Sequence, residues 1–198
     1  MRLLLVRHGQ SEWNASRRLQ GQADIALSDL GRAQADALAP LVAGFAPDLV
    51  ITSDLRRARE TAERLGYPDA VPEPGLREIS VGAWEGQEIP DLISRSADDY
   101  AGWRAGTYCP EGGEAWDAFC SRTEAAIHRA ARDDAGTVLM VCHGGVIRAI
   151  LHRLIGLEPR HIVPVSPASL SAMRIENGRA RLELYNLRPS GPEFDVAD

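Results

Sequence analysis

Residues 3–9 read LLLVRHG, and residues 138–145 read VLMVCHGG. In both stretches a short run of apolar, partly branched side chains leads directly into His-Gly, which is typical of a buried parallel strand that ends in a tight turn. A histidine at such a strand end is a packing residue, a metal ligand or a catalyst. The surroundings of His8 and His143 decide among these three interpretations.

The rest of the chain alternates between strand and helix patterns. Residues 28–45 begin with a capping serine and carry apolar residues at helical spacing, namely Leu30, Ala33, Ala37, Leu38 and Leu41. A connection rich in proline is expected around residues 71–75. Further strands are predicted over residues 2–7, 47–53 and 136–143, and further helices over residues 54–66, 114–134 and 146–156.

The end of the chain has a different pattern. Asn177-Gly178 separates two alternating runs, which predicts an antiparallel hairpin. We therefore expect a three-layer α/β/α fold whose mostly parallel sheet includes an antiparallel strand. Residues 1–198 are expected to form a single domain, and the polar, irregular, partly helical segment at about 88–113 is expected to be a lid-like insertion.

The composition excludes several classes of protein. The formal net charge of −6 argues against a general nucleic-acid or membrane surface, so an anionic ligand needs a local cluster of arginines. The chain has no apolar run of membrane-spanning length, and its three scattered cysteines predict neither a disulfide framework nor a zinc knuckle. We expect a cytoplasmic protein, either a monomer or a homodimer.

Reactive side chains follow three of the predicted strands. Arg7 and His8 follow the first, residues 53–57 follow the second, and His143 follows the third. Because the carboxyl ends of parallel strands meet at one edge of a sheet, these side chains are expected to converge there. Two histidines and at least two arginines would then share one site.

This combination is suited to phosphoryl transfer. Planar guanidinium groups bind phosphate oxygens in pairs, and a neutral imidazole can attack phosphorus to form a phosphohistidine. A second histidine would stabilise the transferring group, and the glycines beside both histidines let the backbone approach it. The reaction also needs a proton donor. Glu78 and Glu85 are both candidates, and their spacing does not choose between them.

The sequence then shows a specific resemblance. It resembles the histidine phosphatase superfamily, also called the phosphoglycerate mutase-like family, and the likeness covers most of the chain in the family's order. One RHG triplet is weak evidence, whereas five linked blocks are strong evidence. The blocks are LVRHGQSEWN (5–14), RLQGQADIALSDLGRAQA (18–35), SDLRRARETA (53–62), LREISVGAWEG (76–86) and VCHGGVIRAIL (141–151).

The resemblance implies a role for each matching residue. His8 is the implied nucleophile, Glu78 the proton donor and His143 the stabiliser of the transferring group. No cofactor or metal is implied, and the substrate is a small phosphorylated metabolite. The implied phosphate-binding groups are Arg7, Arg57, Asn14 and the backbone near Gly21 and Gly144.

Two alternatives concern the chemistry. Metal binding is disfavoured because no histidine pair has the i, i+4 spacing with a carboxylate that helical zinc sites use. Residues 142–148 satisfy C-x5-R, which resembles the phosphate loop of cysteine-dependent phosphatases. That interpretation leaves Arg7 and His8 unexplained, so Cys142 is interpreted as a buried strand residue.

Two further alternatives concern the activity. Mutases of this family resemble one another in a longer chain and an adjacent arginine pair after the proton donor, whereas here Arg104 stands alone, which favours hydrolysis. A binding protein that has lost turnover is disfavoured because every expected catalytic position is filled. The lid looks similar to that of small bacterial phosphatases acting on alpha-ribazole phosphate and of broad-specificity members, but lid residues do not identify the physiological substrate.

Overall fold

A six-stranded sheet with the strand order β3-β2-β4-β1-β5-β6 forms the centre of the computed structural model, which describes residues 1–130 and 136–191. β5 is antiparallel to both of its neighbours, so the other strands run parallel to one another. The predicted sheet is confirmed. Its strands are β1 (Arg2–Arg7), β2 (Leu49–Thr52), β3 (Val71–Pro72), β4 (Thr137–Cys142), β5 (Leu170–Glu176) and β6 (Arg179–Leu187).

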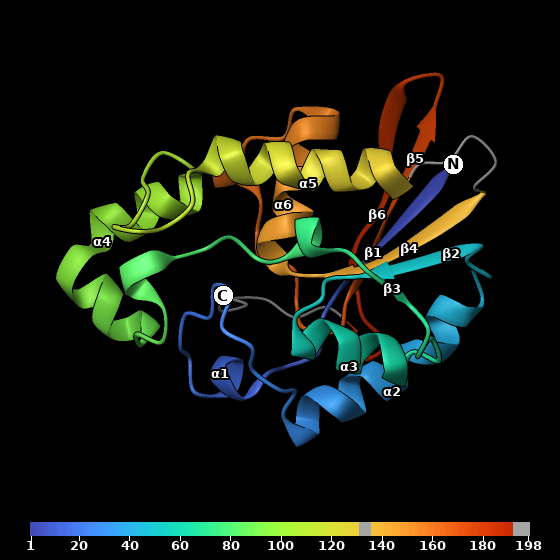
Figure 1. Ribbon diagram of the computed structural model, residues 1–198, viewed down its shortest axis with the longest axis horizontal. Helices are drawn as coiled ribbons and strands as arrows, with labels where there is room; N and C mark the ends of the chain where they lie inside the picture. Colours follow the sequence, from blue (N-terminus) through green and yellow to red (C-terminus); the bar gives the residue numbers. More distant parts are fainter. Residues whose placement is uncertain (131–135, 192–198) are drawn as a thin grey trace.

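Helices cover both faces of this sheet (Figure 1). α5 (Trp116–Ala130) and α6 (Gly144–Ile155) lie on one face, and α2 (Asp29–Ala43) and α3 (Arg56–Arg64) lie on the other. The predicted three-layer α/β/α arrangement is therefore confirmed. The remaining helices are α1 (Glu12–Ala15), α4 (Ile89–Ala105) and the single 3-10 turns Pro74–Leu76, Gly82–Trp84 and Pro159–His161.

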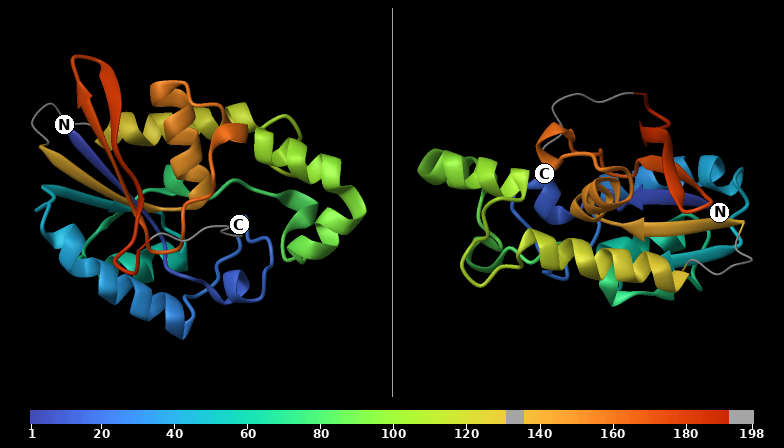
Figure 2. Two further views of the ribbon diagram at one scale, coloured as in Figure 1. Left: turned by 180° about the vertical axis from the view of Figure 1, so that it is seen from behind. Right: turned by 90° about the horizontal axis from the view of Figure 1, so that it is seen from above.

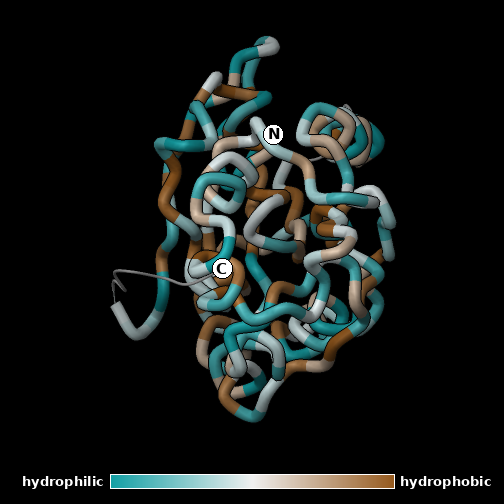
Figure 3. The backbone as a smooth tube through the Cα atoms, turned by 90° about the vertical axis from the view of Figure 1, so that its left-hand side faces the viewer, coloured by the Kyte–Doolittle hydropathy of each residue, from teal (hydrophilic) through white to brown (hydrophobic). Residues whose placement is uncertain are grey.

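The alternation of side chains along β1 explains why the strand is apolar throughout. Leu3 and Leu5 belong to the apolar cluster on the side of α5 and α6, whereas Leu4 and Val6 belong to the cluster on the side of α2 and α3. All four are fully buried, and burial of one such side chain stabilises the fold by about 1.5–3 kcal/mol. Figure 3 shows hydrophobic stretches of the chain running through the middle of the molecule.

The predicted apolar face of α2 was partly wrong. Leu30 is 55% exposed, and Ala33 and Ala37 are exposed too, whereas Ala35 and Leu38 are buried. Alanines mark a helical face weakly because they occur on both sides of the helix. The true face includes Gly31, where a side chain would collide with the backbone of Gln10: an added Cβ would lie 1.9 Å from the Gln10 carbonyl oxygen.

Two connecting segments are more regular than expected. The proline-rich connection contains the short strand β3, which pairs with β2. The segment 88–113 contains the helix α4, which is interrupted at Ser96 by a non-helical φ of −151°. Because of that interruption, the apolar residues of the two halves do not follow one continuous helical spacing. The sequence pattern therefore does not predict a single helix here. α4 lies apart from the sheet at one end of the molecule in both views of Figure 2.

The C-terminal hairpin is as predicted. Glu176 pairs with Arg179 across the turn, and Asn177 and Gly178 have φ values of 51° and 71°, which suit an Asn-Gly turn. The helix predicted over residues 114–134 is confirmed as α5 up to residue 130, and residues 131–134 lie outside the described part. Within the described residues, no helix has the length and apolar character needed to cross a membrane.

Candidate active site

The parallel strands bring the reactive side chains to one edge of the sheet. β1 and β4 are neighbours in register, with Arg7 opposite Cys142, so the next residue of each strand is a histidine at the same level. The rings of His8 and His143 are 5.1 Å apart between centroids, at an angle of 62°. Both histidines are buried, with 3% and 0% of their surface exposed.

His8 has a defined tautomer. Its Nδ1 lies 2.7 Å from the carbonyl oxygen of Gly9, which can only accept, so Nδ1 carries the proton. Nε2 therefore keeps its lone pair, and Nε of Arg57 donates to it at 3.3 Å. Burial first, and then the charges of Arg57 and Arg7, hold the pKa of His8 well below its usual value. The imidazole is thus neutral, with its proton on Nδ1 and the lone pair of Nε2 facing Arg57.

Arg57 is the arginine of the 53–57 segment that reaches the site. It is fully buried near the start of α3, whereas Arg56 is exposed. Its two terminal nitrogens donate to the carbonyl oxygens of Ala23 and Gly21 at 2.7 and 2.9 Å, which leaves Nε directed at His8. Burial lowers its pKa to about 10, so the guanidinium stays charged at neutral pH.

The loop that holds Arg57 is itself fastened by Glu85. One carboxylate oxygen of Glu85 accepts from the backbone N–H groups of Gln22 and Ala23, both at 3.1 Å. Glu85 is exposed and does not line the pocket, whereas Glu78 does. Of the two candidate carboxylates, Glu78 therefore lies in the pocket and Glu85 lies outside it.

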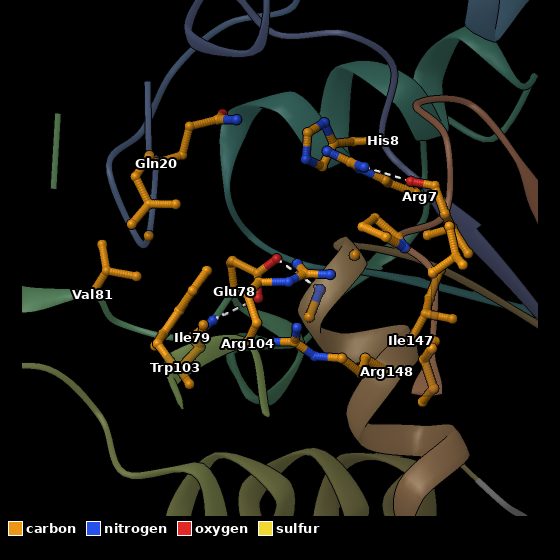
Figure 4. A pocket seen from close by; sticks show the side chains of 18 of the residues that line it. Arg7, His8, Gln20, Glu78, Ile79, Val81, Trp103, Arg104, Ile147 and Arg148 are labelled. Atoms are coloured by element: carbon orange, nitrogen blue, oxygen red, sulfur yellow. Dashed lines mark hydrogen bonds between the residues drawn. The ribbon is translucent and has the colours of Figure 1, made fainter. Parts of the chain in front are cut away.

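Glu78 lies across the pocket from His8 (Figure 4). Its Oε2 accepts from the backbone N–H of Gly145 at 2.9 Å, and its Oε1 accepts from the N–H of Ile79 at 2.8 Å. A Cβ at Gly145 would lie 2.1 Å from Oε1, so only glycine leaves room for this carboxylate. Arg122 of α5 supports the same loop by donating to the Glu78 carbonyl oxygen at 2.9 Å.

His143 lies beside His8 in the interior of the protein. Its Nε2 lies 2.8 Å from the hydroxyl oxygen of Ser53, at the end of β2, so three strand ends contribute to this arrangement. Burial first, and then the positive charges of Arg57 and the other arginines, hold its pKa well below the usual value. His143 itself does not appear on the pocket wall, whereas the adjacent Gly144 does.

The remaining predicted phosphate-binding residues occupy different places. Arg7 lines the pocket and donates through Nη1 to the carbonyl oxygen of Val165. Gly21 also lines it, with a φ of 52° that favours glycine. Asn14 does not line it. The Asn14 side-chain oxygen accepts from the backbone N–H of Ser11 at 3.1 Å, in a capping box at the start of α1.

Several pocket residues had no signal in the sequence. Gln20, Trp103 and Tyr185 line the pocket, and so does Arg148, which the C-x5-R alternative had placed in a phosphate loop. Trp103 comes from α4 and Tyr185 from β6, far from any strand-end motif. Sequence spacing does not reveal that such distant segments meet, so Trp103 and Tyr185 could not be found before the fold was known.

Cys142 occupies the interior of the protein. It is fully buried at the end of β4, burial raises the pKa of its thiol, and it does not line the pocket. These features are opposite to those of a reactive cysteine, which needs a lowered pKa and access to substrate. Over residues 1–130 and 136–191, no group of three or more His, Cys, Asp or Glu side chains could hold a metal ion.

Comparison with known proteins gives a consistent result. The family model described as the histidine phosphatase superfamily (branch 1) matches residues 3–188. A glucosyl-3-phosphoglycerate phosphatase of Mycolicibacterium vanbaalenii is 38% identical over 168 residues, which cover 79% of this chain and 75% of the relative. An adenosylcobalamin/alpha-ribazole phosphatase of Salmonella typhimurium is 35% identical over 196 residues, which cover 95% and 97% of the two chains.

A solved structure is similar over nearly the whole length. The mycobacterial glucosyl-3-phosphoglycerate phosphatase in complex with VO3 superimposes with a TM-score of 0.86 and is 32% identical, with 93% of this chain and 98% of that chain covered. The similarity therefore extends from the strand-end motifs to the arrangement of the whole chain.

Proposed function

The chain belongs to the histidine phosphatase superfamily, branch 1, and from that premise we propose that its pocket hydrolyses a phosphomonoester through a phosphohistidine at His8. The relatives above are phosphatases that are named for small phosphorylated metabolites. The observation that best supports the proposal is the state of His8, whose Nδ1 is bound to the Gly9 carbonyl oxygen while Nε2 faces Arg57.

In the first step, Nε2 of His8 attacks phosphorus as the bond between phosphorus and the leaving oxygen breaks. Glu78, in its protonated form, gives its proton to that oxygen, and the alcohol leaves. When the phosphate binds, the Nε–H of Arg57 exchanges its bond to His8 Nε2 for a bond to a phosphoryl oxygen, which frees the lone pair for attack, and Arg7 binds the phosphoryl oxygens as well. His143 stabilises the charge that develops on them from behind His8.

Further phosphate contacts come from the backbone and from Asn14. Gly21 and Gly144 line the pocket, so the backbone N–H groups near them are the proposed donors, and the start of α6 at Gly144 favours an anion. Asn14 is proposed as a phosphate ligand from the family resemblance alone, since its side-chain oxygen is bound to Ser11 and it does not line the pocket. The phosphoryl group is thus surrounded by donors.

In the second step, water attacks the phosphohistidine. The carboxylate of Glu78 takes a proton from the water as the new phosphorus–oxygen bond forms and the bond to Nε2 breaks. Orthophosphate leaves, His8 is again neutral, and Glu78 is again protonated. The cycle balances without a metal or cofactor, and none is proposed.

The test is hydrolysis of p-nitrophenyl phosphate without added metal or bisphosphoglycerate, with the variants His8→Ala and Cys142→Ser compared. We expect turnover by the wild-type protein, none by His8→Ala, and most of the activity in Cys142→Ser. The reverse order of the two variants would contradict the histidine mechanism. Activity that requires bisphosphoglycerate and moves phosphate between hydroxyls would indicate a mutase, and no turnover would indicate a binding protein.

The setting of the enzyme is also a proposal. The net charge of −6 supports a small anionic substrate drawn by the pocket arginines and argues against nucleic acid or an anionic membrane surface as a partner. Free cysteines at positions 109, 120 and 142 support a reducing, cytoplasmic compartment. We propose that residues 1–198 act as a single domain with α4 in its lid, as a monomer or a homodimer.

A further inference from the structure

The pocket extends beyond the groups that would bind the phosphate, and its walls there are mainly apolar. They come from separate parts of the chain, including the loop between α1 and α2, the loop that follows β3, the helices α4 and α6, and the segment that follows the last 3-10 turn. Four of these side chains are labelled in Figure 4 around the open space. The apolar residues used below are Leu19, Ile79, Val81, Trp103, Ile147 and Val163.

The polar side chains of this part are largely engaged with the protein itself. Gln20 accepts a hydrogen bond from the hydroxyl of Ser11 at 2.7 Å. Arg18 forms an ion pair with Glu88 at 2.7 Å. The hydroxyl of Tyr185 donates to the carbonyl oxygen of a rim residue, Val163. These contacts fix the walls, and they leave few groups for a polar ligand.

The choice of polar residue types is equally informative. Among the described residues that line the pocket, none is Asn, Asp, Ser or Thr, the short side chains whose oxygens accept hydrogen bonds from hydroxyl groups. Arg104 and Arg148 also line it, but a guanidinium only donates. The acceptor side chains that do line it already have partners: Gln20 accepts from Ser11, and both carboxylate oxygens of Glu78 accept from backbone N–H groups. A polyhydroxylated group placed here would therefore lose its water contacts and regain few acceptors for its hydroxyl protons.

Trp103 gives the apolar part a rigid wall. Its ring lies 6.2 Å from that of Trp84 and 5.6 Å from that of Tyr100, between centroids. On another side, the guanidinium of Arg148 lies 5.7 Å above the Trp103 ring and 5.0 Å above the Trp116 ring. An indole held by aromatic and cation–π contacts on several sides is already positioned for a ligand.

We propose that the leaving alcohol of the substrate is predominantly apolar where it adjoins the phosphate, and that it is neither a sugar nor another polyol. This inference rests on the proposed phosphatase function and identifies its substrate class. The apolar walls bind an alkyl or aryl body by removing it from water, while the phosphate is bound at Arg7, Arg57 and His8. Each buried methylene then contributes about a fourfold gain in kcat/KM.

The test uses substrates whose chemistry is alike and whose polarity differs. The values of kcat/KM are measured for propyl, butyl, pentyl and hexyl phosphate, and for glycerol 3-phosphate and glucose 6-phosphate. Propyl phosphate and glycerol 3-phosphate share a three-carbon chain and differ in hydroxyl groups. We expect kcat/KM to rise about fourfold per methylene, mainly through KM, and propyl phosphate to exceed glycerol 3-phosphate by about tenfold or more.

A matched pair of variants places the effect in the pocket. Val163 is 60% exposed on the rim, and Val71 is 53% exposed on β3 and does not line the pocket. Val163→Thr should lower kcat/KM for hexyl phosphate by about threefold to fivefold and leave propyl phosphate within about twofold, because only the longer chain reaches the rim. Val71→Thr makes the same chemical change and should alter neither value.

The outcomes separate this inference from the proposed function. If the substrates are hydrolysed but kcat/KM does not change with alkyl chain length, the inference is wrong and the phosphatase function stands. The same holds if glucose 6-phosphate or glycerol 3-phosphate is preferred. An equal loss for hexyl and propyl phosphate in Val163→Thr would also overturn it. Failure to hydrolyse any of these substrates or p-nitrophenyl phosphate would overturn both.

Discussion

A methyl group at position 145 would lie 2.1 Å from Oε1 of Glu78, closer than any real contact. The Gly145→Ala variant must therefore move the carboxylate away from the backbone N–H that now orients it. If Glu78 is the proton donor, kcat for an alkyl phosphate should fall by about 100-fold or more. The loss should be smaller for p-nitrophenyl phosphate, whose leaving group departs without a proton. Steady-state kinetics on both substrates measure this difference.

The matched control is Gly44→Ala. Gly44 is the C-cap of α2 with a right-handed helical conformation, and an added Cβ would lie 3.4 Å from its nearest neighbour, the carbonyl oxygen of Leu41. We expect this variant to retain wild-type kinetics. Equal losses on both substrates in Gly145→Ala would show that the variant damages the phosphate site and would argue against an acid role for Glu78.

Single residues differ in how far the sequence predicts them. The strand-end positions of His8 and His143 follow from an apolar run and a glycine, because register makes neighbouring strand ends coincide. The choice between Glu78 and Glu85 does not follow, because both lie in one irregular loop whose path depends on contacts with α5 and α6. Trp103 lines the pocket through a helix whose position no local pattern indicates.

At the scale of elements, Arg122 connects α5 to the loop that carries Glu78. It donates to the carbonyl oxygens of Gly75, Arg77 and Glu78 at 2.7–3.0 Å and forms an ion pair with Glu114. Lysine has one ammonium and cannot reproduce this planar set of donors. In Arg122→Lys we expect kcat to fall about tenfold or more with little change in KM, again more for alkyl than for p-nitrophenyl phosphate. Kinetics and thermal unfolding are measured together.

Arg129→Lys is the matched control on the same helix. Arg129 pairs with Glu73 at 2.9 Å, but its side chain is 57% exposed and does not line the pocket, so the pair contributes little to stability and nothing to the geometry of the pocket. Its kinetics should be unchanged. A lowered melting temperature in Arg122→Lys with unchanged kcat would mean that Arg122 only stabilises the fold.

Predictability of the elements depends on how clear their periodicity is. β1 and β4 are short and apolar throughout, and their predicted extents differ from the observed ones by no more than one residue at either end. α2 was correctly predicted as a helix with part of its face wrong, because alanines mark a face weakly and Gly31 is buried by a backbone contact. α4 was underestimated because its two halves are out of phase at Ser96.

At the scale of the molecule, an acidic chain holds a basic, largely buried site. The sheet brings Arg7, His8 and His143 together from strands that are distant in sequence, and α3 adds Arg57. Burying these groups has a cost, because charged forms lose hydration. The histidines avoid that cost by staying neutral. The charges of Arg7 and Arg57 are stabilised by hydrogen bonds to backbone carbonyl oxygens and, in the proposed complex, by the bound phosphate.

This arrangement predicts a pH dependence of stability. The pKa values of His8 and His143 are lowered in the folded protein, and both would be protonated below about 6.5 in the unfolded chain. The unfolded state then binds more protons, so the stabilisation is fully present above about pH 6.5 and is lost as the pH falls below it. Each histidine contributes about 1.4 kcal/mol of unfolding free energy per pH unit in that window.

The measurement is the free energy of unfolding by urea from pH 7.5 to pH 5, for wild type and His8→Gln. The variant should lose less stability on acidification, by about 1.4 kcal/mol per pH unit below pH 6.5, because one of the two protonations is gone. His128→Gln, at an exposed position of α5, should follow the wild-type slope. If the free energy of unfolding depends on pH in the same way for wild type and His8→Gln, the fold does not hold His8 neutral. The neutral, attacking form of His8 would then have to arise only when the phosphate binds.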